Sequence, residues 1–517
     1  MTRKKRDRAA AAAASSRVQE AGGDHVLSRN RRRALIGAPG LPAYRSDLAR
    51  IEQTLSRLRT ADLPKEVTCR MVNPTVSVIR CSWKNLLPLL ERNANGEERA
   101  PEEGEEILLL WKMPGAGDVR YKVASSEDLL ALKMVFEDRA ASAVAAEAAL
   151  PVGAVDAALD RAAEQGILLA PPSLLRRDPA LFHRGQRDDR FLSTSVFTLQ
   201  WHITQACDLH CKHCYDRSAR STVPLEQAFG VLDDLRSFCR SRGVSGQVSF
   251  TGGNPLLHPH FTELYRAAVE RGLTVAILGN PSTRKALEEL AAIQRPAFFQ
   301  VSLEGLLEHN DAIRGPGHFD RVIDFLRLLR ELDIYSMVML TLTRNNMEQV
   351  LPLADLLRGI TDTFTFNRLS AVGEGARLQP VPVEIYPAFL ERYAEAAEEN
   401  PIMGLKDSLI NILHQRKGLE LFGGCAGFGC GAAFNFAALL PDGEVHACRK
   451  FPSPIGTINT RGLAEIYDSA EARRYREGCS ACAPCPLRPV CGGCLAVAHS
   501  AGKNIFKERD PYCFVEP

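Results

Sequence analysis

The sequence predicts an α/β protein with a central parallel sheet, an N-terminal α+β module and a C-terminal cysteine-rich domain. Three observations lead to this prediction. Apolar strand-like runs alternate with helical stretches between residues 199 and 366, β-like runs precede three short helical stretches near the N-terminus, and most cysteines lie in two clusters. A chain of 517 residues is long enough for about three domains.

The N-terminal region is expected to contain a tail and a small module. Residues 1–45 begin with a basic, alanine-rich stretch without the apolar core of a secretory signal, so we expect a disordered tail. Residues 46–175 are the next predicted domain, with a helix over 46–58, three β-like runs and three short helices within 126–170. The runs are Val67–Val78, Ile107–Lys112 and Val119–Val123, and the expected apolar helical positions are Leu129, Leu132, Phe136, Val144, Ala148, Val155 and Leu159. This order predicts a winged-helix-like module, with a structural cap or a DNA-binding winged helix as alternatives.

The central domain is predicted over residues 190–400. Its expected strands are Leu199–Ile203, Val248–Phe250, Val275–Leu278, Phe298–Ser302, Ser336–Leu342 and Thr363–Phe366. Its expected helices are Pro224–Arg242, Phe261–Arg271, Arg284–Ile293, Phe319–Glu331 and Met347–Leu357, with Ser221 or Thr222 capping the first. Functional groups in such a fold gather at the carboxyl ends of the parallel strands.

Three closely spaced cysteines, Cys207, Cys211 and Cys214, form the most informative motif. Three thiolates on one loop can hold three irons of a [4Fe–4S] cluster and leave the fourth iron open for chemistry. An electron-carrying ferredoxin would supply four ligands. The spacing alone leaves a zinc loop or a chance arrangement open.

Nine of the fifteen cysteines lie between Cys425 and Cys513, which predicts a metal-binding domain over 415–517. The odd total and the lack of an export signal favour metal sites in a reducing cytoplasm over disulfides. Two zinc knuckles are the alternative to iron–sulfur clusters, because paired cysteines also suit tetrahedral zinc. Cys479 is expected to be a spare thiol or a substitute ligand.

The segment from Cys207 to Tyr215 resembles the cluster motif of the radical SAM superfamily, in which S-adenosylmethionine chelates the open iron. The resemblance implies a partial (β/α)6 barrel. Thr251-Gly252-Gly253-Asn254-Pro255 resembles the family's Gly-Gly-Glu motif, with asparagine in place of glutamate, and Ser302-Leu-Glu-Gly305 resembles a later motif. The implied cofactor-binding residues are Tyr215, Gly252, Gly253, Asn254, Asn280, Ser302 and Arg314.

The C-terminal cysteine pattern resembles the SPASM domain, which binds two auxiliary [4Fe–4S] clusters. The resemblance implies that one cluster is held by Cys425, Cys430, Cys448 and Cys494. It implies that the other is held by Cys482, Cys485, Cys491 and Cys513.

These resemblances together imply a radical SAM/SPASM peptide maturase. Such an enzyme would cleave S-adenosylmethionine reductively, abstract hydrogen from a ribosomally made precursor peptide and install a crosslink such as a thioether, or an oxidation. The expected electron donor is a flavodoxin or a ferredoxin-type protein. Residues 46–175 faintly resemble the precursor-recognition domain of such enzymes, which adds a leader peptide to a sheet edge. No catalytic acid or base can be assigned from the sequence.

Three alternatives remain at this point: a sulfatase-type maturase of a whole protein, a small-molecule radical SAM enzyme, and a non-catalytic iron–sulfur or zinc scaffold. A net charge of +2 argues against nucleic acid or membrane as a partner. No stretch approaches the roughly 18 apolar residues of a membrane span. We expect a cytoplasmic protein.

Overall fold

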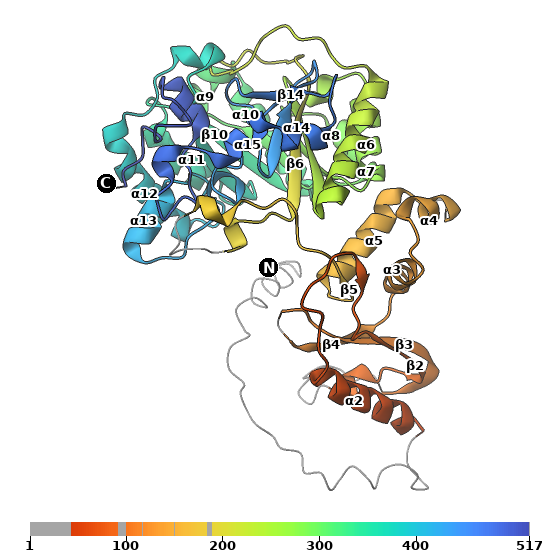
Figure 1. Cartoon of the computed structure of the whole chain (residues 1–517). Helices are drawn as coiled ribbons and strands as arrows, with labels where there is room; N and C mark the ends of the chain where they lie inside the picture. Colours follow the sequence, from red (N-terminus) through yellow and green to blue (C-terminus); the bar gives the residue numbers. More distant parts are fainter. Residues whose placement is uncertain (1–42, 91–99, 116, 149, 183–188, 516–517) are drawn as a thin grey trace. The chain divides into compact units, whose positions relative to one another are not determined.

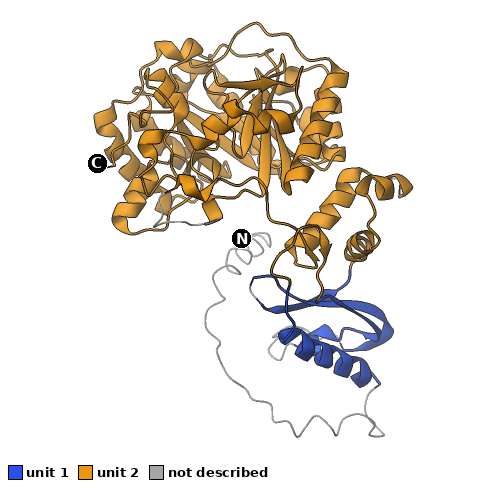
Figure 2. Cartoon of the chain, viewed as in Figure 1, with its two compact units in different colours: residues 1–63, 75–124 blue, residues 64–74, 125–517 orange. Residues whose placement is uncertain are grey.

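The computed structural model describes residues 43–90, 100–115, 117–148, 150–182 and 189–515. The chain forms two compact units, Met1–Leu63 with Thr75–Ala124 and Pro64–Pro74 with Ser125–Pro517, which Figure 2 distinguishes by colour. The stretch 46–175, predicted as one domain, is therefore divided between both units. The predicted disorder of the tail concerns residues that, up to residue 42, lie outside the described part of the chain.

The first unit is a three-stranded antiparallel sheet covered by one helix. The sheet order is β2-β3-β4, so β2 and β4 are its edges. The apolar face of the helix, with Ile51 and Leu58, is buried against Ile79, Leu108 and Leu110 of the sheet. The bounds are α2 Arg45–Arg59, β2 Ser77–Lys84, β3 Glu102–Lys112 and β4 Val119–Val123.

The run Val67–Val78, predicted as one strand, is not continuous. It contains the short β1, Met71–Val72, and only the start of β2, because Pro74 lacks the N–H group that a strand ladder needs. β1 pairs in antiparallel fashion with β5, Leu168–Leu169, in the second unit.

Three helices precede β5, as predicted: α3 Ser126–Phe136, α4 Ala141–Glu147 and α5 Val152–Glu164. Ser125 and Asp128 form a capping box at the start of α3. Asp156 on α5 forms ion pairs with Arg236 and Arg240, which joins α5 to the following domain. Of the positions expected to be helical, Leu132, Val144, Val155 and Leu159 are buried, whereas Phe136, the last residue of α3, is 84% exposed, and Ala148, which follows α4, is exposed.

The second unit is built on a nine-stranded sheet of order β11-β10-β9-β8-β7-β6-β12-β13-β14. The strands from β6 to β11 are all parallel, and each lies beside its successor in the sequence. Helical crossovers connect them, which confirms the predicted α/β fold with its partial (β/α)6 barrel (Figure 1). The bounds are β6 Val196–Thr204, β7 Ser245–Gly252, β8 Thr274–Leu278, β9 Phe299–Ser302, β10 Ser336–Leu342 and β11 Thr363–Arg368.

The helices bury their apolar faces on this sheet. Leu232 and Leu235 of α6, for example, belong to one buried cluster with Val248 and Phe250 of β7. The predicted cap of α6 was wrong: the residue before the helix is Pro224, and no side chain caps it. The bounds are α6 Leu225–Arg242, α7 Phe261–Glu270, α8 Arg284–Ile293, α9 Leu307–Arg314, α10 His318–Glu331, α11 Val350–Leu357, α12 Tyr386–Glu399 and α13 Ile410–Lys417.

The C-terminal strands extend the same sheet rather than forming one of their own. β12, Phe436–Leu439, lies parallel to β6, and β13, Glu444–His446, and β14, Pro454–Thr457, follow in antiparallel order. The remaining helices are α14 Leu463–Asp468, α15 Ala470–Glu477 and α16 Leu495–Ser500. Because β12 pairs with β6, the second cysteine-rich region starts beside the strand that leads into the first. No helix of the described residues has the length and hydropathy needed to cross a membrane.

Candidate active site

A cavity of about 530 Å³ lies at the carboxyl ends of the parallel strands. This volume lies within the roughly 300–1,000 Å³ of typical small-molecule sites. Of the residues predicted to bind the cofactor or the first cluster, nine line the cavity: Cys207, Cys211, Cys214, Tyr215, Gly252, Gly253, Asn280, Ser302 and Arg314. Asn254 does not.

The three cysteines of the first loop have polar neighbours on three sides. The Asn280 amide lies 3.7 Å from Cys207 Sγ, and Arg314 Nη1 lies 3.7 Å from Cys211 Sγ. Cys214 Sγ donates to the carbonyl oxygen of Asp216 at 3.3 Å. Burial raises the pKa of both Cys211 and Cys214, so iron coordination is needed to keep these thiols ionised at neutral pH.

Gly252 and Gly253 allow β7 to approach the cysteine loop. A Cβ atom at Gly252 would lie 2.2 Å from Thr204 O, and one at Gly253 would lie 2.2 Å from Ala206 O. Gly252 also has a φ of +134°, which favours glycine. The sequence suggested that the glycines admit a ligand. In the structure their small size also serves contact with the backbone that leads into Cys207.

Asn254 lies behind the cavity. It is buried, its amide donates to Asp208 Oδ1 at 3.1 Å, and its side-chain oxygen accepts from Leu256 N at 3.4 Å. Asn280 donates to the same Asp208 oxygen at 2.6 Å. Two amides therefore hold one carboxylate beside Cys207, and the cofactor contact of Asn254 itself stays a prediction.

A buried group of charges lies beside Cys211. Arg314 donates through Nε and Nη2 to Glu304 Oε1, at 2.9 and 2.6 Å, and His213 Nε2 lies 3.2 Å from the same oxygen. Although burial acts to raise it, the charges of His213 and Arg314 hold the pKa of Glu304 well below its usual value. His213 lines the cavity, and its Nδ1 is buried without a hydrogen-bond partner among the described residues. It leaves a polar contact free for a ligand.

His202 and Tyr215 line the cavity next to the first cysteine loop. His202 Nε2 lies 3.2 Å from the Tyr215 hydroxyl. Burial lowers the pKa of His202 to about 3 and raises that of Tyr215 to about 12. Both side chains are therefore neutral at physiological pH.

The eight C-terminal cysteines predicted as ligands fall into two groups in space. Burial raises the pKa of Cys430 to about 12, and the neighbouring Cys425, Cys494 and Cys448 act in the same direction. The other four, Cys482, Cys485, Cys491 and Cys513, line one small cavity together with Gly492 and Gly493. The resemblance to the SPASM domain implies the same two sets of four. All fifteen cysteines are free thiols.

These donor sets suit iron–sulfur clusters. Among the described residues, no three His, Cys, Asp or Glu side chains converge on a point where one metal ion could be held. The thiolate ligands of a cubane bind separate irons, so they surround a volume instead of meeting at one point. The cavity beside the first three thiols leaves room for S-adenosylmethionine next to the cluster.

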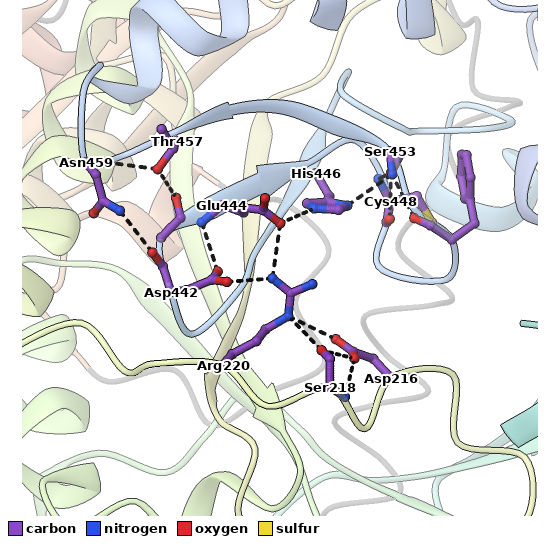
Figure 3. A network of polar contacts seen from close by, with 12 residues as sticks. Asp216, Ser218, Arg220, Asp442, Glu444, His446, Cys448, Ser453, Thr457 and Asn459 are labelled. Carbon is purple, nitrogen blue, oxygen red and sulfur yellow. Dashed lines mark hydrogen bonds and ion pairs between the residues drawn. The ribbon is translucent and has the colours of Figure 1, made fainter. Parts of the chain in front are cut away.

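A polar network joins the first cysteine loop to the hairpin formed by β12 and β13 (Figure 3). Arg220 pairs with Asp216, Asp442 and Glu444 at 3.4, 2.6 and 3.1 Å. From Glu444 the network continues through His446 Nε2, which donates at 3.2 Å.

The far end of this network reaches a predicted cluster ligand. His446 Nδ1 accepts from Ser453 N at 3.1 Å, and Ser453 Oγ accepts from Cys448 N at 3.1 Å (Figure 3). One set of contacts thus connects the backbone near Cys214 with the backbone at Cys448, and both cysteines are predicted cluster ligands.

Sequence reasoning missed several residues of the site. Asp208, His213 and Arg220 lie next to the recognised cysteines but belong to no motif that we recognised. Arg368, Arg449 and Lys450 line the cavity from distant parts of the chain. Only the proximity of Arg449 and Lys450 to Cys448 could have drawn attention to them.

Comparisons with known proteins identify both cysteine-rich regions. The radical SAM superfamily model matches residues 201–357, and SPASM, an iron–sulfur cluster-binding domain, matches residues 430–494. The AdoMet-dependent heme synthase of Methanosarcina barkeri is 28% identical over 344 residues, covering 62% of this chain and 96% of that protein. The antilisterial bacteriocin subtilosin biosynthesis protein AlbA of Bacillus subtilis is 27% identical over 321 residues, covering 58% and 67%.

A solved structure shares the fold. The crystal structure of Streptococcus suis SuiB bound to precursor peptide SuiA has a TM-score of 0.52 at 16% identity, and the match covers 79% of this chain and 96% of that one. The chain described here thus carries a radical SAM domain and a SPASM domain, and it is an enzyme of the radical SAM class. Its cofactors are a [4Fe–4S] cluster with S-adenosylmethionine and auxiliary iron–sulfur clusters.

Proposed function

We propose that this enzyme is a maturase of a ribosomally made precursor peptide. The observation that carries the proposal is one cavity lined both by the three loop thiols and by Arg449 and Lys450, which directly follow the predicted auxiliary-cluster ligand Cys448. The similarity to AlbA and SuiB supports a peptide substrate. The product is a crosslink, such as a thioether, or an oxidation.

In this proposal Cys207, Cys211 and Cys214 hold the first cluster. When bound, the cluster and S-adenosylmethionine supply reductive cleavage of the sulfonium and hydrogen abstraction from a peptide carbon. The protein supplies position and charge: Arg314 and Asn280 lie against two of the thiols, and the buried Glu304 fixes the Arg314 guanidinium. Gly252, Gly253, Ser302, Tyr215 and Asn254 complete the proposed cofactor-binding residues.

The C-terminal thiols hold the auxiliary clusters in two sets. Cys425, Cys430, Cys448 and Cys494 form the set nearer the cavity, because Cys448 directly precedes the cavity residues Arg449 and Lys450. Cys482, Cys485, Cys491 and Cys513 form the second set. The proposal keeps the domain spans 190–400 and 415–517. It also places the enzyme in a reducing compartment such as the cytoplasm, with a flavodoxin or ferredoxin-type protein as the electron donor.

The first unit offers a binding mode for a leader peptide. β2 and β4 are the edges of its antiparallel sheet, and Val78 on β2 and Val123 on β4 are 56% and 46% exposed. An extended peptide can add a strand to such an edge through main-chain hydrogen bonds. This supports a role in precursor recognition for the module within 46–175.

A second candidate is a small-molecule radical SAM enzyme. The match to the heme synthase, which covers 96% of that protein, favours it. The match covers 62% of this chain, so a large part of the chain has no counterpart there. The part without a counterpart includes the open sheet edges of the first unit. A peptide substrate gives these edges a role.

The test uses anaerobically reconstituted full-length protein. We expect about twelve irons per chain from three cubane clusters, and 5′-deoxyadenosine from S-adenosylmethionine under dithionite. Co-expression with short peptides encoded beside this chain should then give a mass change in one of them. Zinc in place of iron, or no deoxyadenosine, would refute the radical mechanism. Deoxyadenosine without a modified peptide, but with a modified tetrapyrrole, would favour the second candidate.

A further inference from the structure

The wall of the active-site cavity carries an excess of positive charge. Five cationic side chains line it, Arg217, Arg314, Arg368, Arg449 and Lys450, against the single carboxylate of Asp216. Two of the five are neutralised by buried carboxylates. Arg314 pairs with Glu304, and Arg368 pairs with Asp407 and Asp510.

Arg449 and Lys450 have no carboxylate partner among the described residues, but Lys450 lies near Cys494, Cys425 and Cys448, the thiols of one predicted auxiliary set. Within the described ranges, neither forms an ion pair, and the one side-chain hydrogen bond of Arg449 is a long contact of 3.5 Å from Nη1 to Thr251 Oγ1. Both residues are only partly exposed. A partly buried cation is costly without a counter-charge. The predicted cluster thiolates can supply part of it for Lys450, and a ligand in the cavity can supply it for Arg449.

We propose that Arg449 and Lys450 form an anion-binding wall that receives a carboxylate of the substrate. Two parts of a peptide carry this group, an acidic side chain and the C-terminus. The proposal rests on the proposed function, because it takes the cavity to be where the substrate meets the radical chemistry. It narrows the substrate class to peptides with a carboxylate near the modified residue.

The position of the wall explains why a substrate group is a suitable occupant. Arg449 and Lys450 directly follow Cys448 in the C-terminal domain. The loop thiols and the glycine motif belong to the barrel, and both groups of residues line the same cavity. A carboxylate on this wall would hold one end of a substrate while another part of it faces the barrel. Charge-assisted hydrogen bonds are about twice as strong as neutral ones, and they orient the group that accepts them.

The experiment measures binding of three pentapeptides to the reconstituted holoenzyme with bound S-adenosylmethionine, by anaerobic titration calorimetry. One peptide is blocked at both ends and has a central glutamate, the second has a central glutamine, and the third has no acidic side chain but a free C-terminal carboxylate. We expect at least one acidic peptide to bind about tenfold more tightly than the glutamine peptide. The peptide that does so identifies the source of the carboxylate.

Variants assign the effect to the wall. Lys450→Met should remove the preference for the acidic peptide, and Lys450→Arg should retain it. Lys507→Met, an exposed lysine of the same domain, is the matched control and should bind as the wild type. Equal binding of all three peptides, or binding of none, overturns the proposal.

One further outcome points to a different occupant. If Lys450→Met weakens the response of the cluster's EPR signal to S-adenosylmethionine and leaves peptide preference intact, the wall serves the cofactor carboxylate and the proposal is wrong. The experiments distinguish failure of the proposed function from failure of the anion-binding wall. Absence of deoxyadenosine in the wild type refutes the proposed function, whereas a wild-type protein that forms deoxyadenosine but does not discriminate between the peptides refutes only the wall.

Discussion

Replacing Glu304 by glutamine tests whether the buried charges beside the first cysteine loop organise the site. Glu304 accepts from Arg314 twice, from His213 and, at 2.7 Å, from Thr341 N. The side chains of Arg314 and Glu304 are 9% and 2% exposed. Breaking such a pair on one side costs about 3–5 kcal/mol, because the other charge stays buried. The glutamine oxygen can still accept from Thr341, so we expect the lower end, about 3 kcal/mol.

Thermal unfolding of the cluster-free protein measures this effect. A loss of 1 kcal/mol lowers Tm by about 2–4 °C in a domain of 150–250 residues, the size range of the predicted domain 190–400, so Glu304→Gln should lower the Tm of this domain by at least about 6 °C. Glu308→Gln, an exposed neighbour that forms no ion pair within the described part of the chain, is the control and should change Tm by less than about 2 °C. A double variant with Arg314→Met should regain much of the loss, because no charge is then left unpaired. A Glu304→Gln protein as stable as the control would refute the reasoning.

The same pair predicts a pH dependence. The pKa of Glu304 is lowered by folding, so its contribution to stability is fully present above the unfolded value of about 4.3 and is lost as pH falls below it. The difference in Tm between wild type and Glu304→Gln should therefore shrink below about pH 4. A difference that grows with acidification would contradict the assigned charge state.

Three further changes test other parts of the site. Gly253→Ala places a Cβ atom 2.2 Å from Ala206 O, so reconstituted protein should lose the loop cluster and bind about eight irons instead of about twelve; a full iron content would contradict the close packing. Arg220→Gln should lower stability by about 1–2 kcal/mol, because three carboxylates lose their shared cation, whereas Arg327→Gln, at a 62% exposed ion pair, should cost less than about 0.5 kcal/mol. Cys479 donates to Glu508 O and does not line the cavity of the second thiol set, so Cys479→Ser should keep the iron content that Cys482→Ser lowers by about four; equal losses would make Cys479 a ligand.

Local sequence determined much of the architecture. Short apolar runs and helical stretches with period 3.6 predicted β6–β11 and most intervening helices, because strands buried on both faces and amphipathic helices impose those patterns. The resemblance to the radical SAM and SPASM motifs implied three sets of thiols, and the structure brings the C-terminal eight together in the two groups so implied. The predictions that were wrong are local ones. Val67–Val78 is interrupted at Pro74, and α6 has no side-chain cap.

Tertiary structure alone decided which charges meet at the cavity. Arg368 at the end of β11 reaches Asp510 near the C-terminus, and Arg220 reaches Asp442 and Glu444. Arg449 and Lys450 enter the cavity because β12 pairs with β6, a contact between strands more than 200 residues apart in the sequence. The periodicity of apolar residues indicates only which face of one segment is buried. The spacing of a motif indicates only ligands that lie close together in the sequence. The partner of a buried charge depends on which segments the sheet order places side by side, and no single segment carries that information.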